Sequence, residues 1–167
     1  ENKRAGKYFS QAITMLQENN LKEDLAAAYS YYGLNGIATG DYVGSIENFE
    51  KSNVLSKEQN NQIQMCENNL YLGRNYENMG NNAKALEYYQ GALSLAKNMK
   101  KERLETEATI FIGALYSDGL NPKLGSEYLA KAAAVAEEIQ DTSLLISSYT
   151  YIANNHYYNK EYILALK

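Results

Sequence analysis

The side chains that could carry out acid–base, nucleophilic or metal chemistry are few in this chain and lie far apart in its sequence. His156 is the only histidine and Cys66 is the only cysteine. Neither therefore has a second imidazole or thiol at metal-ligand spacing, and nothing in the sequence pairs a nucleophile with a base. We expect no catalytic residues, no metal site and no cofactor. We interpret His156 as a packed or hydrogen-bonded core histidine and Cys66 as a buried or half-buried structural thiol.

Two short patterns imitate functional motifs. The segment Gly33-Leu34-Asn35-Gly36 has paired glycines, but it lies within a helical pattern. It has no strand before it and no Gly-Lys-Ser/Thr after it, both of which a phosphate-binding loop requires. Glu137 and Glu138 are adjacent, so on a helix their carboxylates point in different directions, which is typical of solvated surface. Both patterns favour a structural interpretation.

Charge and hydropathy limit the classes of partner. The chain has 16 basic and 20 acidic residues and a net charge of −4, whereas a duplex-binding protein needs a basic face. No apolar run approaches the roughly 18 residues that a membrane-spanning helix needs. We therefore expect no nucleic-acid partner and no membrane contact from this segment. A lone cysteine fits a reducing compartment somewhat better, which favours a cytoplasmic over a periplasmic location.

An internal repeat with a period of 40 residues organises the sequence. Small residues form one column, at Gly33, Gly73, Gly113 and Ala153. Aromatic residues form a second, at Tyr31, Tyr71, Phe111 and Tyr151. A third column is again small, at Ser45, Ala85, Gly125 and Ala165. Several columns with one spacing indicate a repeat protein, whose units cannot bury their apolar faces alone and must stack on one another.

Each repeat has helical periodicity on both sides of a turn signal, so each is predicted to be a hairpin of two helices. The first helices of the hairpins are predicted at about 21–39, 59–79, 101–118 and 141–159. The second helices are predicted at about 3–18, 42–57, 82–99 and 122–139, with a further one that begins near Glu161. We expect a single domain over 1–167, divided into a half repeat at 1–20, repeats at about 21–58, 59–99 and 100–140, and a partial repeat at 141–167. Because the chain starts at Glu1 and stops within a helical pattern, we expect a piece of a larger protein.

Over essentially its whole length, the chain resembles the tetratricopeptide repeat family. The repeat at 59–99 follows the family pattern best, with Leu72, Gly73, Tyr76, Ala85, Tyr89 and Ala92. The next repeat keeps Ile112, Gly113, Tyr116, Gly125, Leu129 and Ala132. At the second signature tyrosine the first repeat has Gly36 and the last has His156. The usual period is 34, so we expect each helix to be longer by about 4–5 Å.

The resemblance implies an all-α fold, a right-handed superhelical α-solenoid of antiparallel helix hairpins. Long units of this kind resemble repeats in bacterial signalling proteins and in scaffolds. We therefore expect a protein- or peptide-binding domain that acts as a sensory or scaffolding segment, and not an enzyme. Two alternatives are a self-association module that forms a homodimer and a non-catalytic part of a multidomain enzyme.

In the family the first helices line the concave face, which identifies candidate peptide-binding positions here. These are Leu34, Ile37, Arg74, Glu77, Asn78, Ser117, Asp118, Asn154, Tyr157 and Tyr158. Such a face would be apolar in the first repeat, mixed in charge in the middle and rich in Tyr and Asn in the last. Tyr supplies contact area at a small entropic cost, and Asn can both donate to and accept from a peptide backbone. Most of the 16 tyrosines are nevertheless expected to pack helices together.

Overall fold

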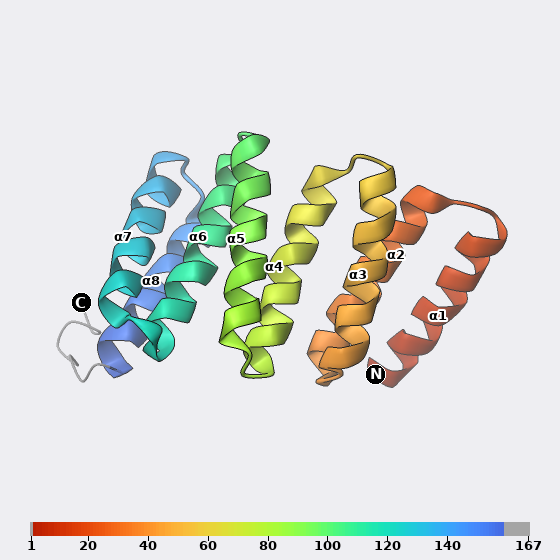
Figure 1. Cartoon of the computed structure of the whole chain (residues 1–167), viewed down its shortest axis with the longest axis horizontal. Helices are drawn as coiled ribbons and strands as arrows, with labels where there is room; N and C mark the ends of the chain where they lie inside the picture. Colours follow the sequence, from red (N-terminus) through yellow and green to blue (C-terminus); the bar gives the residue numbers. More distant parts are fainter. Residues whose placement is uncertain (1, 159–167) are drawn as a thin grey trace. The chain divides into compact units, whose positions relative to one another are not determined.

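The computed structural model describes the backbone of residues 2–158 and the side chains of residues 4–157, and over this range it is helical throughout (Figure 1). The α-helices are α1 (Asn2–Glu18), α2 (Lys22–Thr39), α3 (Tyr42–Glu58), α4 (Gln62–Asn78), α5 (Asn82–Asn98), α6 (Glu102–Leu115), α7 (Pro122–Glu138) and α8 (Thr142–Tyr158). A π-helical turn, η1 (Tyr116–Leu120), follows α6. No strand occurs within residues 2–158, which confirms the all-α prediction. The helix expected from Glu161 lies outside the described residues.

The turns between helices repeat with the period of the sequence. After α1, α3, α5 and α7 comes a residue with a positive φ of 55–57°, namely Asn20, Asn60, Lys100 and Gln140. After α2, α4 and η1 the positive φ falls on a glycine, namely Gly40, Gly80 and Gly119. The next helix begins where a side-chain oxygen accepts the backbone N–H three residues on, at Asp41, Asn61, Asn81, Asn121 and Asp141. Capping of this kind satisfies N–H groups that have no partner within the helix.

The chain forms two compact units, unit 1 up to Tyr88 and unit 2 from Tyr89. We call α2, α4, α6 and α8 the A helices and α1, α3, α5 and α7 the B helices. In unit 1, α2 packs against α1, α3 and α4, and α3 also packs against α4. In unit 2, α7 packs against α6 and α8, and α6 also contacts α8. Within each unit, then, hairpins stack so that neighbouring A helices lie side by side.

The small-residue column marks the places where the helices of a hairpin approach most closely. A Cβ added at Gly33 would lie 2.8 Å from the ring of Phe49, and one added at Gly113 would lie 2.9 Å from Leu129. Phe49 and Leu129 are both fully buried. The glycine on the A helix therefore makes room for a large side chain on the B helix, which offsets the roughly 1 kcal/mol that a helical glycine costs relative to alanine.

The predicted helix at 101–118 ends earlier than expected. Its α-helical part stops at Leu115, and Asp118 (φ −74°, ψ 25°) and Gly119 (φ 117°) have non-helical angles within the following turn. The glycine that ends the A helix stands at 119 here, one residue earlier than the period requires from Gly40 and Gly80. α7 nevertheless begins in register at Pro122, so one more residue separates the glycine from the next helix than after Gly40 and Gly80. The wider π turn accommodates this residue.

Candidate functional site

In unit 1 the predicted peptide-binding residues lie on two neighbouring A helices. The two helices are in contact, and they run in the same direction because each is antiparallel to α3. Leu34 and Ile37 on α2 are half-buried. On α4, Arg74 and Asn78 are exposed and Glu77 is half-buried. We call the surface formed by the candidate residues on the A helices the A-helix face. In unit 1 this face is apolar along α2 and polar along α4.

In unit 2 the exposed candidates are Asp118, in the turn after α6, and Asn154 and Tyr157 on α8. Tyr158 is the last residue of α8, and its side chain lies outside the described residues. Ser117 does not lie where the sequence placed it. It is buried, its hydroxyl donates to the Gly113 carbonyl at 2.9 Å, and a Cβ added at Gly125 on α7 would meet its Oγ. Its side chain therefore faces the partner helix, and the prediction that it contacts a ligand is corrected.

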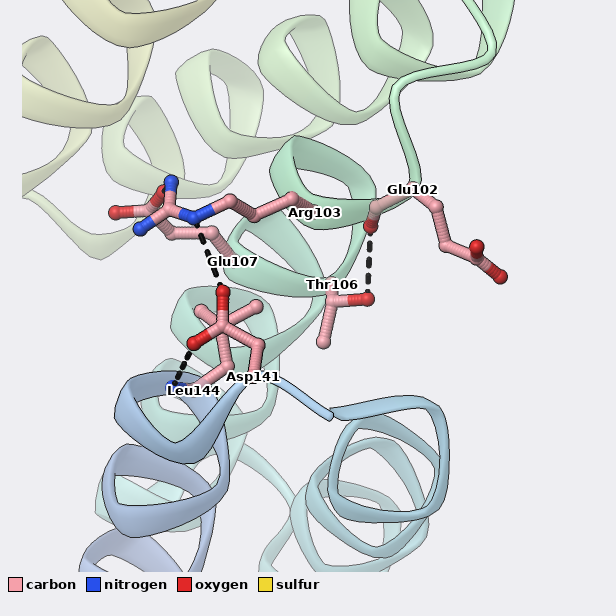
Figure 2. Close-up of polar contacts among 6 residues, drawn as sticks. All are labelled: Glu102, Arg103, Thr106, Glu107, Asp141 and Leu144. Carbon is pink, nitrogen blue, oxygen red and sulfur yellow. Dashed lines mark hydrogen bonds and ion pairs between the residues drawn. The ribbon is translucent and has the colours of Figure 1, made fainter. Parts of the chain in front are cut away.

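An ion-pair cluster links the N-terminal ends of α6 and α8 (Figure 2). Arg103 on α6 donates through Nε to Asp141 Oδ2 at 3.1 Å and lies 3.4 Å through Nη1 from Glu107 Oε2. The other oxygen of Asp141 accepts the backbone N–H of Leu144 at 3.1 Å and so caps α8. The Asp141 carboxylate thus caps α8 and also links it to the neighbouring A helix α6.

A cleft in unit 1 was not among the predicted positions. It lies between α1 and α3 above α2, has a volume of ≈ 630 Å³, and its lining includes the glycines Gly6, Gly36 and Gly44 and the amides Asn35 and Asn48. Its charged lining consists of two lysines and two carboxylates, namely Lys7, Lys51, Asp41 and Glu47. The volume falls within the range of small-ligand sites, about 300–1,000 Å³. Because the cleft borders both B helices, it is a different surface from the A-helix face.

One repeat further along, in the hairpin of α4 and α5, the positions of Gly36 and Asn48 are held by Tyr76 and Tyr88. Tyr76 and Tyr88 stack there with ring centroids 5.4 Å apart and an interplanar angle of 9°. The Nζ of Lys84 lies 4.8 Å from the centre of the Tyr76 ring, a cation–π geometry. Burial raises the pKa of Tyr88, and Tyr76 and the carboxylates of Glu50 and Glu87 raise it further. The second signature tyrosine is therefore part of a packed aromatic cluster in this hairpin.

The remaining chemistry-bearing residues have structural surroundings. Cys66 is fully buried, as predicted, and His156 is half-buried. Within the described residues, no three His, Cys, Asp or Glu side chains come together as metal ligands would. None of the helices described is both long and apolar enough to cross a bilayer.

No protein-family profile and no curated protein matches the sequence. Solved structures do match in three dimensions. The apo form of RapI aligns with a TM-score of 0.84 and 17% identity over 99% of this chain and 46% of its own. A putative kinesin light chain of Podospora anserina with nearly identical TPR-like repeats aligns with a TM-score of 0.74 and 12% identity, over 99% of this chain and 82% of its own.

A third solved structure is a signal transduction ATPase with numerous domains from Pyrococcus horikoshii, which carries a tetratricopeptide repeat sensor. It aligns with a TM-score of 0.75 and 16% identity over 95% of this chain and 25% of its own. The chain thus spans less than half of RapI and a quarter of this ATPase. Together the three likenesses show that the fold is that of TPR-like helical repeats, as the signature residues predicted.

Proposed function

We propose that this chain of TPR-like repeats is a protein- or peptide-binding domain that serves a larger regulatory protein as its sensory or scaffolding segment, without catalysis of its own. The observation that carries the proposal is the pairing of A helices. In each unit two of them lie side by side, and together they present exposed polar side chains next to apolar ones. One structural neighbour, a signal transduction ATPase that carries a tetratricopeptide repeat sensor, supports the regulatory context.

The exposed side chains on these helices suit a peptide of limited acidity. On α4, Arg74 can donate to backbone or side-chain carbonyls, and Asn78 can both donate and accept. In unit 2, Asn154 offers the same amide chemistry, and Tyr157 is 59% exposed and offers a broad ring with a polar tip. The half-buried Leu34 on α2 adds apolar contact area in unit 1.

Replacing Arg74, Asn78 and Asn154 together by alanine is expected to weaken peptide binding by several kcal/mol, since each of the three removes exposed polar groups from the A-helix face. Peptides selected from a random library on the wild-type protein would be titrated by calorimetry against the variant. A matched control replaces three exposed residues at equivalent positions of the B helices, Lys57, Lys97 and Glu137. If the control variant loses binding and the A-helix variant keeps it, the binding face is wrongly assigned.

Self-association is a second candidate, favoured by exposed apolar side chains on the first and last described helices. Tyr8 and Met15 on α1 and Ile146 and Tyr149 on α8 are each more than half exposed, and exposed apolar patches often mark protein contacts. If they form a dimer interface, sedimentation velocity will show a weight-average mass that rises with concentration. Met15→Glu and Ile146→Glu together are then expected to abolish that rise. A mass that stays at that of one chain, 18.8 kDa, at all concentrations rules this candidate out.

A further inference from the structure

One face of α1 is left uncovered within unit 1. Among the described helices, α3 packs against two A helices, α2 and α4, whereas α1 packs against α2. Ala12 on α1 is exposed, although Ser52, which holds the same position of the repeat in α3, has no exposed surface. Tyr8 and Met15 are 68% and 63% exposed. Because residues three and four apart share one side of a helix, Tyr8, Ala12 and Met15 form an apolar stripe along α1.

Opposite charges stand at the two ends of this stripe. Arg4 lies one turn before Tyr8, Glu18 lies one turn after Met15, and both are exposed. Neither side chain takes part in an ion pair with another described residue. The helix dipole favours a negative charge at the N-terminus and a positive charge at the C-terminus, and α1 has the reverse order. The stability of α1 by itself therefore does not account for these two charges.

The charged and apolar residues of the stripe are arranged symmetrically about its centre. The midpoint between Arg4 and Glu18 falls at position 11, and that between Tyr8 and Met15 falls half a residue later, a difference of about 0.75 Å along a helix. If a second α1 lies antiparallel on this face, Arg4 of each copy is level with Glu18 of the other. Tyr8 of each copy is then level with Met15 of the other, and the small Ala12 lies near the centre, where the axes approach most closely. The face is thus complementary to itself, as a two-fold symmetric interface requires.

We propose that this face of α1 binds the same face of a second copy of the chain, as an antiparallel helix pair. The inference rests on the self-association candidate, to which it assigns one interface, and it is independent of peptide binding on the A-helix face. A parallel pair would place Arg4 against Arg4 and Glu18 against Glu18, and like charges at facing positions repel each other. α1 has 17 residues and is therefore about 25 Å long, so the pair buries less than the roughly 1,200 Å² of a stable complex. We expect a weak dimer, with a dissociation constant on the order of 100 μM.

The test is an exchange of the two charges, followed by sedimentation equilibrium over concentrations that span this dissociation constant. Arg4→Glu and Glu18→Arg are each expected to raise the dissociation constant about tenfold, because each places like charges together at both ends of the pair. Both changes favour the dipole of α1, so a loss of the dimer cannot be attributed to a loss of the helix. The double variant Arg4→Glu, Glu18→Arg restores opposite charges and is expected to dimerise like the wild-type protein. An equimolar mixture of the two single variants is expected to form a heterodimer for the same reason.

Matched controls make the same changes in net charge elsewhere. Lys97→Glu and Glu137→Arg alter exposed positions of α5 and α7, and both are expected to leave the dimer unchanged. An equal loss in these controls, a dimer that survives Arg4→Glu, or a double variant that fails to dimerise refutes the α1 interface without refuting self-association. A wild-type protein that stays at the mass of one chain refutes both. None of these outcomes affects the titration of peptide against the A-helix face, so the proposed peptide binding can fail separately.

Discussion

Replacing Phe49 by alanine is expected to lower the free energy of unfolding by about 3–5 kcal/mol, the usual cost of deleting a fully buried aromatic side chain. Phe49 on α3 has no exposed surface, and its ring stacks on Tyr71 of α4 with centroids 5.4 Å apart. The same ring touches the backbone of α2 at Gly33. One side chain therefore holds three helices of unit 1 together. Urea unfolding followed by circular dichroism measures the loss.

A double-mutant cycle separates the close approach at Gly33 from the general value of a large core residue. Gly33→Ala alone is expected to destabilise the protein, because its Cβ would lie 2.8–2.9 Å from three atoms of a buried ring. In the Phe49→Ala background that clash is gone, and the same change is expected to stabilise by up to about 1 kcal/mol through helix propensity. Gly6→Ala is the control, since its Cβ meets nothing closer than 3.7 Å. An equal cost of Gly33→Ala in both backgrounds would show that the Phe49 ring is not what requires the glycine.

Structural features that recur at a fixed position of each repeat could be predicted from the sequence. Gly33 and Gly113 recur at one register because the same close approach recurs, and the turns recur because glycine and a capping Asp or Asn stand at fixed positions. The π turn could not be foreseen, since only the helix register shows how the displaced Gly119 is accommodated. Ser117 was misplaced for a related reason. Equivalence to an exposed position of the family pattern does not fix a side chain's direction next to a distorted turn.

The sequence contains a sign of the cleft, since Gly36 departs from the signature tyrosine. The consequence of this departure depends on Asn48 and Gly44, which lie on the next helix. Only the stacked rings of Tyr76 and Tyr88 show that these positions share one space. A cavity forms where several residues that line the same space are all small. It can be predicted from a sequence only when it is known which positions of the repeat are in contact.

A buried polar cluster in unit 1 could likewise not be predicted, because polar residues in a sequence suggest an exposed position. Asn68 on α4 has no exposed surface. Its Oδ1 accepts from the hydroxyl of Ser30 on α2 at 2.9 Å, and its Nδ2 donates to the hydroxyl of Ser52 at 2.8 Å and to the Oδ1 of Asn53 at 2.9 Å, both on α3. One carboxamide thus bonds to both neighbouring helices. Fully satisfied polar groups of this kind specify one arrangement of the helices.

Asn68→Leu is expected to lower the free energy of unfolding by about 3 kcal/mol or more, because it keeps the volume but leaves several buried polar groups without partners at about 1–3 kcal/mol each. The next repeat shows which apolar residues could replace the whole cluster without leaving buried polar groups unpaired. One repeat later the positions of Ser30, Ser52 and Asn68 are held by buried apolar residues, namely Leu70, Ala92 and Ala108.

The triple variant Ser30→Leu, Ser52→Ala, Asn68→Ala is therefore expected to unfold at a urea concentration close to that of the wild-type protein. It removes both partners of the two hydrogen bonds that join Asn68 to the serines, which can be nearly neutral. The partners that it leaves, Asn53 and Gln64, are only half-buried and can bond to water. Each measurement uses the same urea titration as for Phe49. A triple variant that unfolds at a lower urea concentration than Asn68→Leu would mean that the cluster stabilises the protein by more than the pairing of its own polar groups. If the triple variant is stable but its amide resonances broaden, the polar cluster selects one packing of α2, α3 and α4, and stability alone does not require it.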